Sequence, residues 1–160
     1  MGKYKFVAVD QSKCTGCRVC EYVCTMEKHQ VFNPSRARIH VVRIYPHTNI
    51  AFSCRMCDDA PCVASCPHQG AMVQDQETGV IAVNDALCDG CDKCMKACEN
   101  GSITLEGGKA RMCDLCEGRE GGPACIEWCP EKALELTDDE SRYLKAPAKA
   151  AQETEEVGQG

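Results

Sequence analysis

Sixteen cysteines in a chain of 160 residues fall into four compact groups, and this grouping constrains the fold more than any other feature. Each group begins with C-x-x-C and ends with C-x-x-x-C, and the middle gap is two, four, two and eight residues in groups one to four. The groups are Cys14, Cys17, Cys20 and Cys24; Cys54, Cys57, Cys62 and Cys66; Cys88, Cys91, Cys94 and Cys98; and Cys113, Cys116, Cys125 and Cys129. Four copies of one arrangement indicate one shared chemical role.

Composition favours metal binding over disulfide formation. Phe, Tyr and Trp make up only 5% of the chain, too few for an ordinary hydrophobic core in one compact domain or two small ones. Residues 1–13 contain no apolar stretch typical of a secretion signal, and no run of about 20 apolar residues could cross a bilayer. A cytoplasmic location is therefore expected, where thiols bind metal more often than they pair.

The spacing identifies the metal as iron in iron-sulfur clusters. C-x2-C-x2-C-x3-C is the bacterial ferredoxin pattern, in which three cysteines hold one 4Fe-4S cluster and the fourth ligates the other cluster of a pair. Cys24 follows Cys20 by one helical turn and so points to a second centre. Zinc is the structural alternative, but it needs two C-x-x-C pairs and has no use for a third thiol between them. At four thiolates per cluster, the chain supplies ligands for four clusters.

The lengths between groups indicate which groups pair. Groups two and three read as one contiguous two-cluster unit, whereas groups one and four would meet across the whole chain, although spacing alone also permits one with two and three with four. Hairpins are expected at 33–53 and 101–112, and a turn with a short strand at 76–87. Thr137 and Glu140 form a capping-box signature, which predicts a short helix followed by a mobile end.

Over about residues 4–137, these motifs resemble the four-cluster ferredoxin-like subunits of complex oxidoreductases, with CRMCDDAPCVASCP and CDLCEGREGGPACIEWCP as the distinctive segments. That family includes iron-sulfur subunits of dimethyl sulfoxide reductase, formate dehydrogenase, formate hydrogenlyase, CO dehydrogenase and tungsten aldehyde oxidoreductases. The resemblance implies an α+β, doubled ferredoxin-like fold with pseudo-twofold symmetry. One lobe would comprise residues 1–53 and 99–137, the other 54–98, with 138–160 as a tail.

The resemblance also implies a ligand set for each cluster. These sets are Cys14, Cys17, Cys20 and Cys129; Cys113, Cys116, Cys125 and Cys24; Cys88, Cys91, Cys94 and Cys66; and Cys54, Cys57, Cys62 and Cys98. It further implies that the first and last of these sets lie at the two outer ends of a row of four. Cys24 and Cys98 lack the usual following proline, which predicts altered hydrogen bonds to sulfur near them.

Several other side chains allow two interpretations. Met56, Met112 and Trp128 adjoin cysteines and could exclude water from a cluster, but ordinary packing is the more common role. Arg36, Arg38 and Arg43 alternate with apolar residues, as on a basic docking face or a solvated hairpin. The four histidines are His29, His40, His47 and His68, and they are not needed as ligands because the cysteine set is complete.

The expected function is electron transfer without catalysis. The chain has no nucleotide-binding loop, no nucleophile with its base and no open metal position. We expect a relay bound to a large catalytic subunit, foremost a tungsten or molybdenum pterin enzyme, then a hydrogenase or CO dehydrogenase. A flavin subunit, a ferredoxin or another copy of this chain would accept the electrons. The alternatives are a free-standing polyferredoxin and a zinc-stabilised interaction module. A net charge of −6 argues against nucleic acid as a partner.

Overall fold

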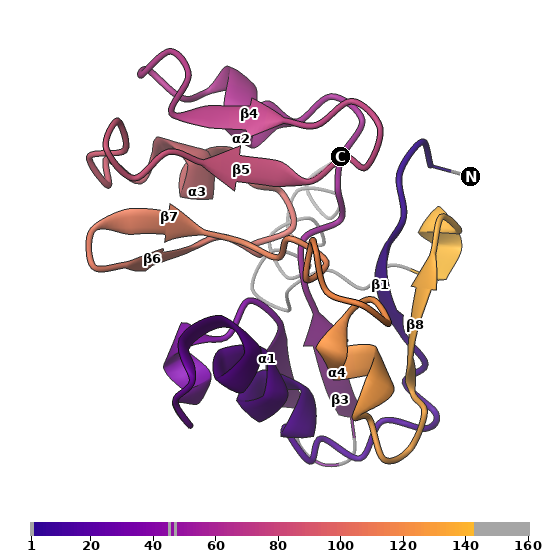
Figure 1. Cartoon of the computed structure of the whole chain (residues 1–160). Helices are drawn as coiled ribbons and strands as arrows, with labels where there is room; N and C mark the ends of the chain where they lie inside the picture. The colour runs from indigo at the N-terminus through magenta and orange to yellow at the C-terminus, as the bar shows by residue number, and fades with distance from the viewer. Residues whose placement is uncertain (1, 45, 47, 143–160) are drawn as a thin grey trace.

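The computed structural model describes residues 2–44, 46 and 48–142, which form small antiparallel hairpins and short helices of the α+β class (Figure 1). The helices are α1 (Val19–His29), α2 (Pro61–Ala64), α3 (Lys93–Ala97) and α4 (Ala124–Glu127), with 3-10 turns at Pro34–Arg36 and Glu140–Arg142. The strands are β1 (Phe6–Val9), β2 (His40–Ile44), β3 (Thr48–Phe52), β4 (Met72–Gln74), β5 (Ile81–Val83), β6 (Thr104–Glu106), β7 (Lys109–Arg111) and β8 (Leu134–Thr137).

Strand β1 joins the beginning of the chain to β8, far along the sequence. The two strands are antiparallel, from Phe6 opposite Thr137 to Val9 opposite Leu134. The other strands pair with their neighbours in sequence, as β2–β3, β4–β5 and β6–β7. The β1–β8 pair therefore closes the first and last described parts of the chain into one unit.

The two faces of β1 belong to different hydrophobic cores. Phe6 and Ala8 pack with one buried cluster, whereas Val7 and Val9 pack with the other. Successive side chains of a strand point to opposite faces, so a run of four apolar residues fits a strand buried on both sides. Strand β1 is thus a wall shared by the two cores.

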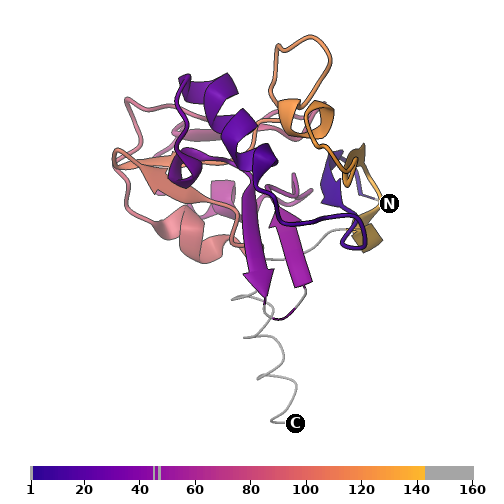
Figure 2. The same cartoon turned by 90° about the horizontal axis from the view of Figure 1, so that it is seen from below.

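The elements gather at two ends of the molecule (Figure 1). Helices α2 and α3 pack together near β4–β5 and β6–β7, whereas α1 packs against α4 near β1, β3 and β8. The view from below shows the β2–β3 hairpin projecting from the body of the molecule beneath α1 (Figure 2). Helices that carry cysteines of groups one and four therefore meet at one end, and helices of groups two and three at the other.

The predicted hairpins are confirmed, with reasons visible in the turns. The β6–β7 turn consists of Gly107 and Gly108, both at positive φ, which is the geometry that a two-residue hairpin favours. The β2–β3 hairpin pairs Ile44 with Thr48. The predicted strand within 76–87 is β5, but its partner β4 was not anticipated.

The predicted helix start at Thr137 is wrong. Thr137 is the last residue of β8, and its hydroxyl accepts a hydrogen bond from the Asp139 amide rather than from that of Glu140. The Asp139 carboxylate accepts from the amide and hydroxyl of Ser141, which stabilises a 3-10 turn over Glu140–Arg142. The expected mobile end lies outside the described residues. Within the described ranges, no helix has the length and apolar character needed to cross a membrane.

Candidate metal centres

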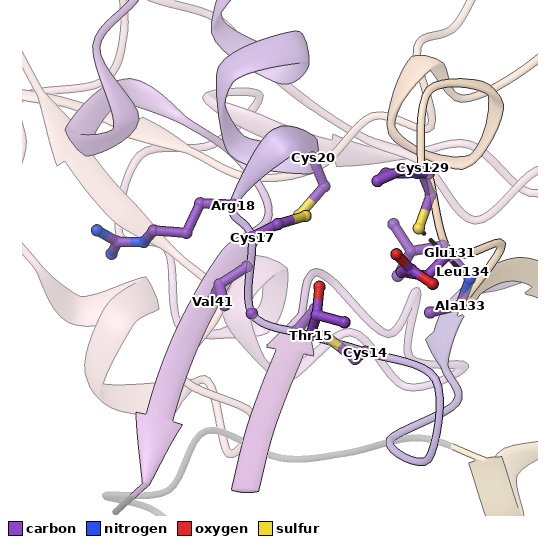
Figure 3. A pocket seen from close by; sticks show the side chains of 13 residues that line it. Cys14, Thr15, Cys17, Arg18, Cys20, Val41, Cys129, Glu131, Ala133 and Leu134 are labelled. Carbon is purple, nitrogen blue, oxygen red and sulfur yellow. Dashed lines mark hydrogen bonds between the residues drawn. The ribbon is translucent and has the colours of Figure 1, made fainter. Parts of the chain in front are cut away.

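The first candidate centre is a pocket at the start of α1, lined by Cys14, Cys17, Cys20 and Cys129 together with apolar residues that include Val41 and Leu134. Figure 3 shows the sulfur atoms of Cys17 and Cys20 on one side and that of Cys129 opposite, while Arg18 points away. The loop before the helix is held by Arg43, whose Nε donates to the Gly16 carbonyl at 3.0 Å. Three thiols of group one thus face one thiol of group four.

A second pocket contains the corresponding thiols of groups two and three. Its cysteines are Cys54, Cys57, Cys62 and Cys98. Unlike the first pocket, it has many polar residues in its lining, among them Asn100 and Ser102. The Gln74 side chain donates to the Cys57 carbonyl at 2.8 Å and so anchors the loop to β4.

A third pocket is lined by Cys66, Cys88, Cys91 and Cys94. The β6–β7 hairpin contributes Leu105 and Ala110 to its lining. Lys109 donates to the Cys88 carbonyl, and Arg111 pairs with Asp85 at 2.7 Å, which fastens the hairpin beside this loop. A glycine is required at Gly90, because a β-carbon there would overlap the carbonyl oxygen of Gly108.

The remaining four thiols, Cys24, Cys113, Cys116 and Cys125, are also neighbours. The pKa of Cys113 is raised to about 12, mainly by burial, and the nearby Cys24 and Cys116 contribute to the rise. Burial likewise raises the pKa of Cys125, and Cys113 is the strongest of the charged neighbours that add to the effect. Cys24 and Cys125 belong to the same buried cluster. The structure therefore brings together each of the four cysteine sets suggested by the family resemblance.

The donor chemistry of these pockets fits a bound metal cluster. Burial raises the pKa of both Cys20 and Cys62 to about 12, so neither thiol ionises on its own near neutral pH. Thiolates bind iron, and a bound cation supplies the charge that stabilises them in a dry pocket. Four convergent sulfurs match the ligand requirement of a 4Fe-4S cluster.

Backbone amides donate to several of these sulfurs. The amide of Ala133 lies 3.4 Å from Cys129 Sγ, that of Arg38 3.3 Å from Cys24 Sγ and that of Leu115 3.5 Å from Cys113 Sγ. Hydrogen bonds of this kind stabilise negative charge on sulfur, which is one way in which a protein adjusts a cluster's reduction potential.

The pocket of Cys24, Cys113, Cys116 and Cys125 adjoins two of the others. Cys113 packs against the buried cluster that contains Cys54, and burial together with Cys113 raises the pKa of Cys54. Burial is the main cause of the raised pKa of Cys125, and Cys113 and Cys20 add to it. The group-one and group-four pockets therefore lie side by side. The expectation that the Cys54 pocket occupies an outer end is therefore wrong. Among the cysteines, all of which are described, the exposed ones are Cys17 and Cys91.

The other candidate residues separate into two types. Met56 and Met112 are buried in the core, whereas Trp128 is 61% exposed and does not close a pocket. The arginines do not form a free basic face, because Arg36 pairs with Glu106, Arg38 with Asp114, and Arg43 with the Gly16 carbonyl.

One histidine, His68, lines the pocket of Cys66, Cys88, Cys91 and Cys94, and its ring lies within 4.8 Å of ligand atoms of Asp89 and Cys91. His29 lies beside Glu106 and His68 beside Asp89, whereas the His40 ring packs at a tilt against Phe52. His47 lies outside the described residues. Sequence reasoning missed Gln74, Asn100, Ser102 and Lys109, all of which hydrogen-bond to cysteines. The missing proline after Cys98 was the available signal for two of them.

Comparison with known proteins agrees with this chemistry. Residues 47–139 match the 4Fe-4S dicluster domain family, and residues 6–32 match a 4Fe-4S binding domain. The putative electron transport protein YsaA of Escherichia coli is 38% identical over 85% of this chain and 91% of its own length. The polyferredoxin-like subunit of the aliphatic sulfonate oxidoreductase of Pyrococcus furiosus is 36% identical over 79% of this chain and 72% of its own.

A third relative is the electron transport protein HydN of Escherichia coli, which is 34% identical over 84% of this chain and 88% of its own length. Among solved structures, a chain of the BamBC complex of benzoyl coenzyme A reductase overlaps at a TM-score of 0.49 and 22% identity, over 96% of this chain and 88% of that one. The family match and the three relatives decide the assignment: this chain belongs to the 4Fe-4S dicluster-domain family of electron-transfer proteins.

Proposed function

We propose that this chain is the non-catalytic electron-transfer subunit of an oxidoreductase complex and carries four 4Fe-4S clusters. The observation that carries the proposal is that sixteen thiols meet as four sets of four, with every thiol used once. Each set takes three cysteines from one group and one from its paired group. With four protein ligands, a cluster has no open position for a substrate, so one-electron transfer is the chemistry that it supplies.

The proposed clusters follow the ligand sets in a row. The order runs from Cys14, Cys17, Cys20 and Cys129, through Cys24, Cys113, Cys116 and Cys125, then Cys54, Cys57, Cys62 and Cys98, to Cys66, Cys88, Cys91 and Cys94. The first two would belong to one lobe and the last two to the other in a doubled ferredoxin-like fold. The second lobe would extend beyond residues 54–98 to include the β6–β7 hairpin, which lines the pocket of Cys66, Cys88, Cys91 and Cys94. Exposed Cys17 and Cys91 mark the two ends of the row.

The partner proposed for the Cys17 end is a large catalytic subunit, foremost a tungsten or molybdenum pterin enzyme. One relative is named as a subunit of an aliphatic sulfonate oxidoreductase and another as subunit 2 of a formate hydrogenlyase, which supports a role within a complex. The acceptor at the Cys91 end would be a flavin subunit, a ferredoxin or another copy of the chain. A free-standing carrier is the second candidate, since other relatives are named simply as electron transport proteins.

Anaerobic purification of the affinity-tagged chain from its source organism tests the proposal. We expect about sixteen iron atoms per chain, four for each cluster. A large subunit that contains tungsten or molybdenum should co-elute. A chain with four clusters that elutes alone would favour the free-standing carrier. Zinc in place of iron would overturn both candidates.

The direction of the relay is tested in the purified complex. Cys17→Ser should block reduction of the clusters by the partner's substrate. Cys91→Ser should leave the remaining clusters reducible while electron delivery to the acceptor collapses. Stopped-flow absorbance, first with substrate and then with acceptor added, separates the two variants, and identical behaviour would exclude a linear relay in this direction.

A further inference from the structure

Two side-chain donors reach the sulfurs of the pocket that contains Cys54, Cys57, Cys62 and Cys98. Asn100 Nδ2 lies 3.5 Å from Cys57 Sγ, and Ser102 Oγ lies 3.6 Å from Cys98 Sγ. Both donors are buried, with 4% of Asn100 and 1% of Ser102 exposed. At Cys24, Cys113 and Cys129, by contrast, the hydrogen bonds to sulfur described above come from backbone amides.

The chain contains its own comparison for Ser102. Four residues after Cys98 stands Ser102, and four residues after Cys129 stands Ala133, which is also buried. The Ala133 position gives its cysteine only a backbone donor, whereas Ser102 brings a hydroxyl close to Cys98. Ser102 is therefore not needed simply to fill space in this kind of turn, because a methyl group suffices at Ala133.

The local backbone explains how Asn100 comes to lie beside Cys57. Cys98 is followed by Glu99 rather than by proline, and Gly101, at positive φ, donates its amide to the Cys98 carbonyl at 3.3 Å. This tight turn buries Asn100 in the lining of the pocket while Glu99 stays exposed. A charged side chain in place of Asn100 would be costly to bury, whereas a neutral amide can be buried once it is hydrogen-bonded.

The direction of both hydrogen bonds is fixed once the sulfurs bind iron. A cysteine thiolate in a cluster has no proton, so it can only accept. The amide nitrogen of Asn100 can only donate, and the Ser102 hydroxyl must then donate to Cys98. Both residues would therefore place positive hydrogen-bond dipoles on sulfur.

We propose that Asn100 and Ser102 raise the reduction potential of the cluster held by Cys54, Cys57, Cys62 and Cys98; this rests on the proposed function. Reduction adds one negative charge, which spreads partly onto the cysteine sulfurs. Donors directed at these sulfurs stabilise the reduced form more than the oxidised form, and the stabilisation is larger in a buried site.

Charged residues at the rim do not cancel this effect. Asp59 and Glu99 line the pocket but are exposed, so solvent and salt screen their negative charge. Arg55 is half-buried, pairs with Glu140 and contributes the opposite sign. The two buried donors act at hydrogen-bond distance, where screening is weakest.

The test is an EPR-monitored redox titration of the holoprotein with Asn100→Leu, Ser102→Ala and the double substitution. Each single variant should lower the midpoint potential of one cluster and leave the others in place. For the double variant, we expect reduction of that cluster to become about tenfold less favourable, which is about 59 mV for a one-electron couple. Ser102→Ala copies the arrangement at Ala133, so it remains decisive if Asn100→Leu does not assemble.

Gln74→Leu is the matched control. Gln74 also directs a side-chain amide at Cys57, but it donates to the backbone carbonyl at 2.8 Å and not to sulfur. It should lower resistance to denaturant without moving any potential. Unchanged potentials in Ser102→Ala and in the double variant, or an equal shift in Gln74→Leu, would overturn the inference. If the unsubstituted chain does not contain the iron of four clusters, the proposed function itself is contradicted.

Discussion

Lys28 Nζ lies 2.8 Å from Asp114 Oδ2, so the last turn of α1 is tied to the loop that follows Cys113. The guanidinium of Arg38 reaches the same oxygen at 2.7 Å. All three side chains are largely shielded from solvent, with 16%, 18% and 24% exposed for Lys28, Arg38 and Asp114. One carboxylate therefore balances two cations where groups one and four meet.

Asp114→Asn should destabilise the protein, because it leaves both cations facing a neutral amide. We expect the free energy of unfolding to fall by about 2 kcal/mol. The guanidinium midpoint of the anaerobic holoprotein, followed at the cluster absorbance, measures this. Asp92→Asn is the control, because the Asp92–Lys96 pair is exposed, and it should cost less than about 0.5 kcal/mol. Equal effects of the two substitutions would contradict the role assigned to Asp114.

Gly90→Ala should damage the centre at Cys66, Cys88, Cys91 and Cys94. Its new β-carbon would push against the Gly108 carbonyl and separate the β6–β7 hairpin from the cysteine loop. We expect loss of iron equivalent to about one cluster of four. Gly118→Ala is the matched control, since Gly118 also has positive φ but has nothing within 4 Å of its added β-carbon. Full iron content in Gly90→Ala would show that the hairpin does not constrain this centre.

Because each proposed cluster takes three cysteines from one group and one from the paired group, certain substitutions should act alike. Cys24→Ala should alter the same EPR signal as Cys113→Ala, and Cys66→Ala should match Cys91→Ala. The measurement is EPR spectroscopy of the dithionite-reduced variants. If Cys24→Ala instead perturbs the signal that depends on Cys14, Cys17 and Cys20, groups one and four do not share ligands as proposed.

Removal of iron should unfold the chain. Cysteines form part of both hydrophobic cores, and few large apolar side chains are available to close the pockets without clusters. Anaerobic chelation should abolish the circular dichroism of a compact state. A cooperative thermal transition in iron-free protein would refute this expectation.

The cysteine spacing predicts the chemistry well because ligand geometry is local. The first three cysteines of each group lie on one loop and the start of one helix, as in Cys14, Cys17 and Cys20 around the start of α1. The β6–β7 hairpin could also be predicted from the sequence, since two glycines define its turn.

Long-range relationships were harder to predict. Nothing near Phe6–Val9 in the sequence indicates that its partner is Leu134–Thr137, and the resulting sheet has no short connection. Strands β4 and β5 have three residues each, too few to show alternation, and β5 was recognised from the turn before it and its run of β-branched residues, which β4 lacks. The proposed row depends on the proximity of Cys113 to Cys54, which belong to two groups that do not pair in the ligand sets.

Both faces of strand β1 are buried, and this limits how the two ends of the molecule can move relative to one another. A hinge between its two ends would have to expose Phe6 and Ala8 on one side or Val7 and Val9 on the other. Uncovering a single large apolar side chain costs about 1.5–3 kcal/mol. Opening and closing are therefore unfavourable, and the gaps that an electron must cross keep a constant width while partners come and go.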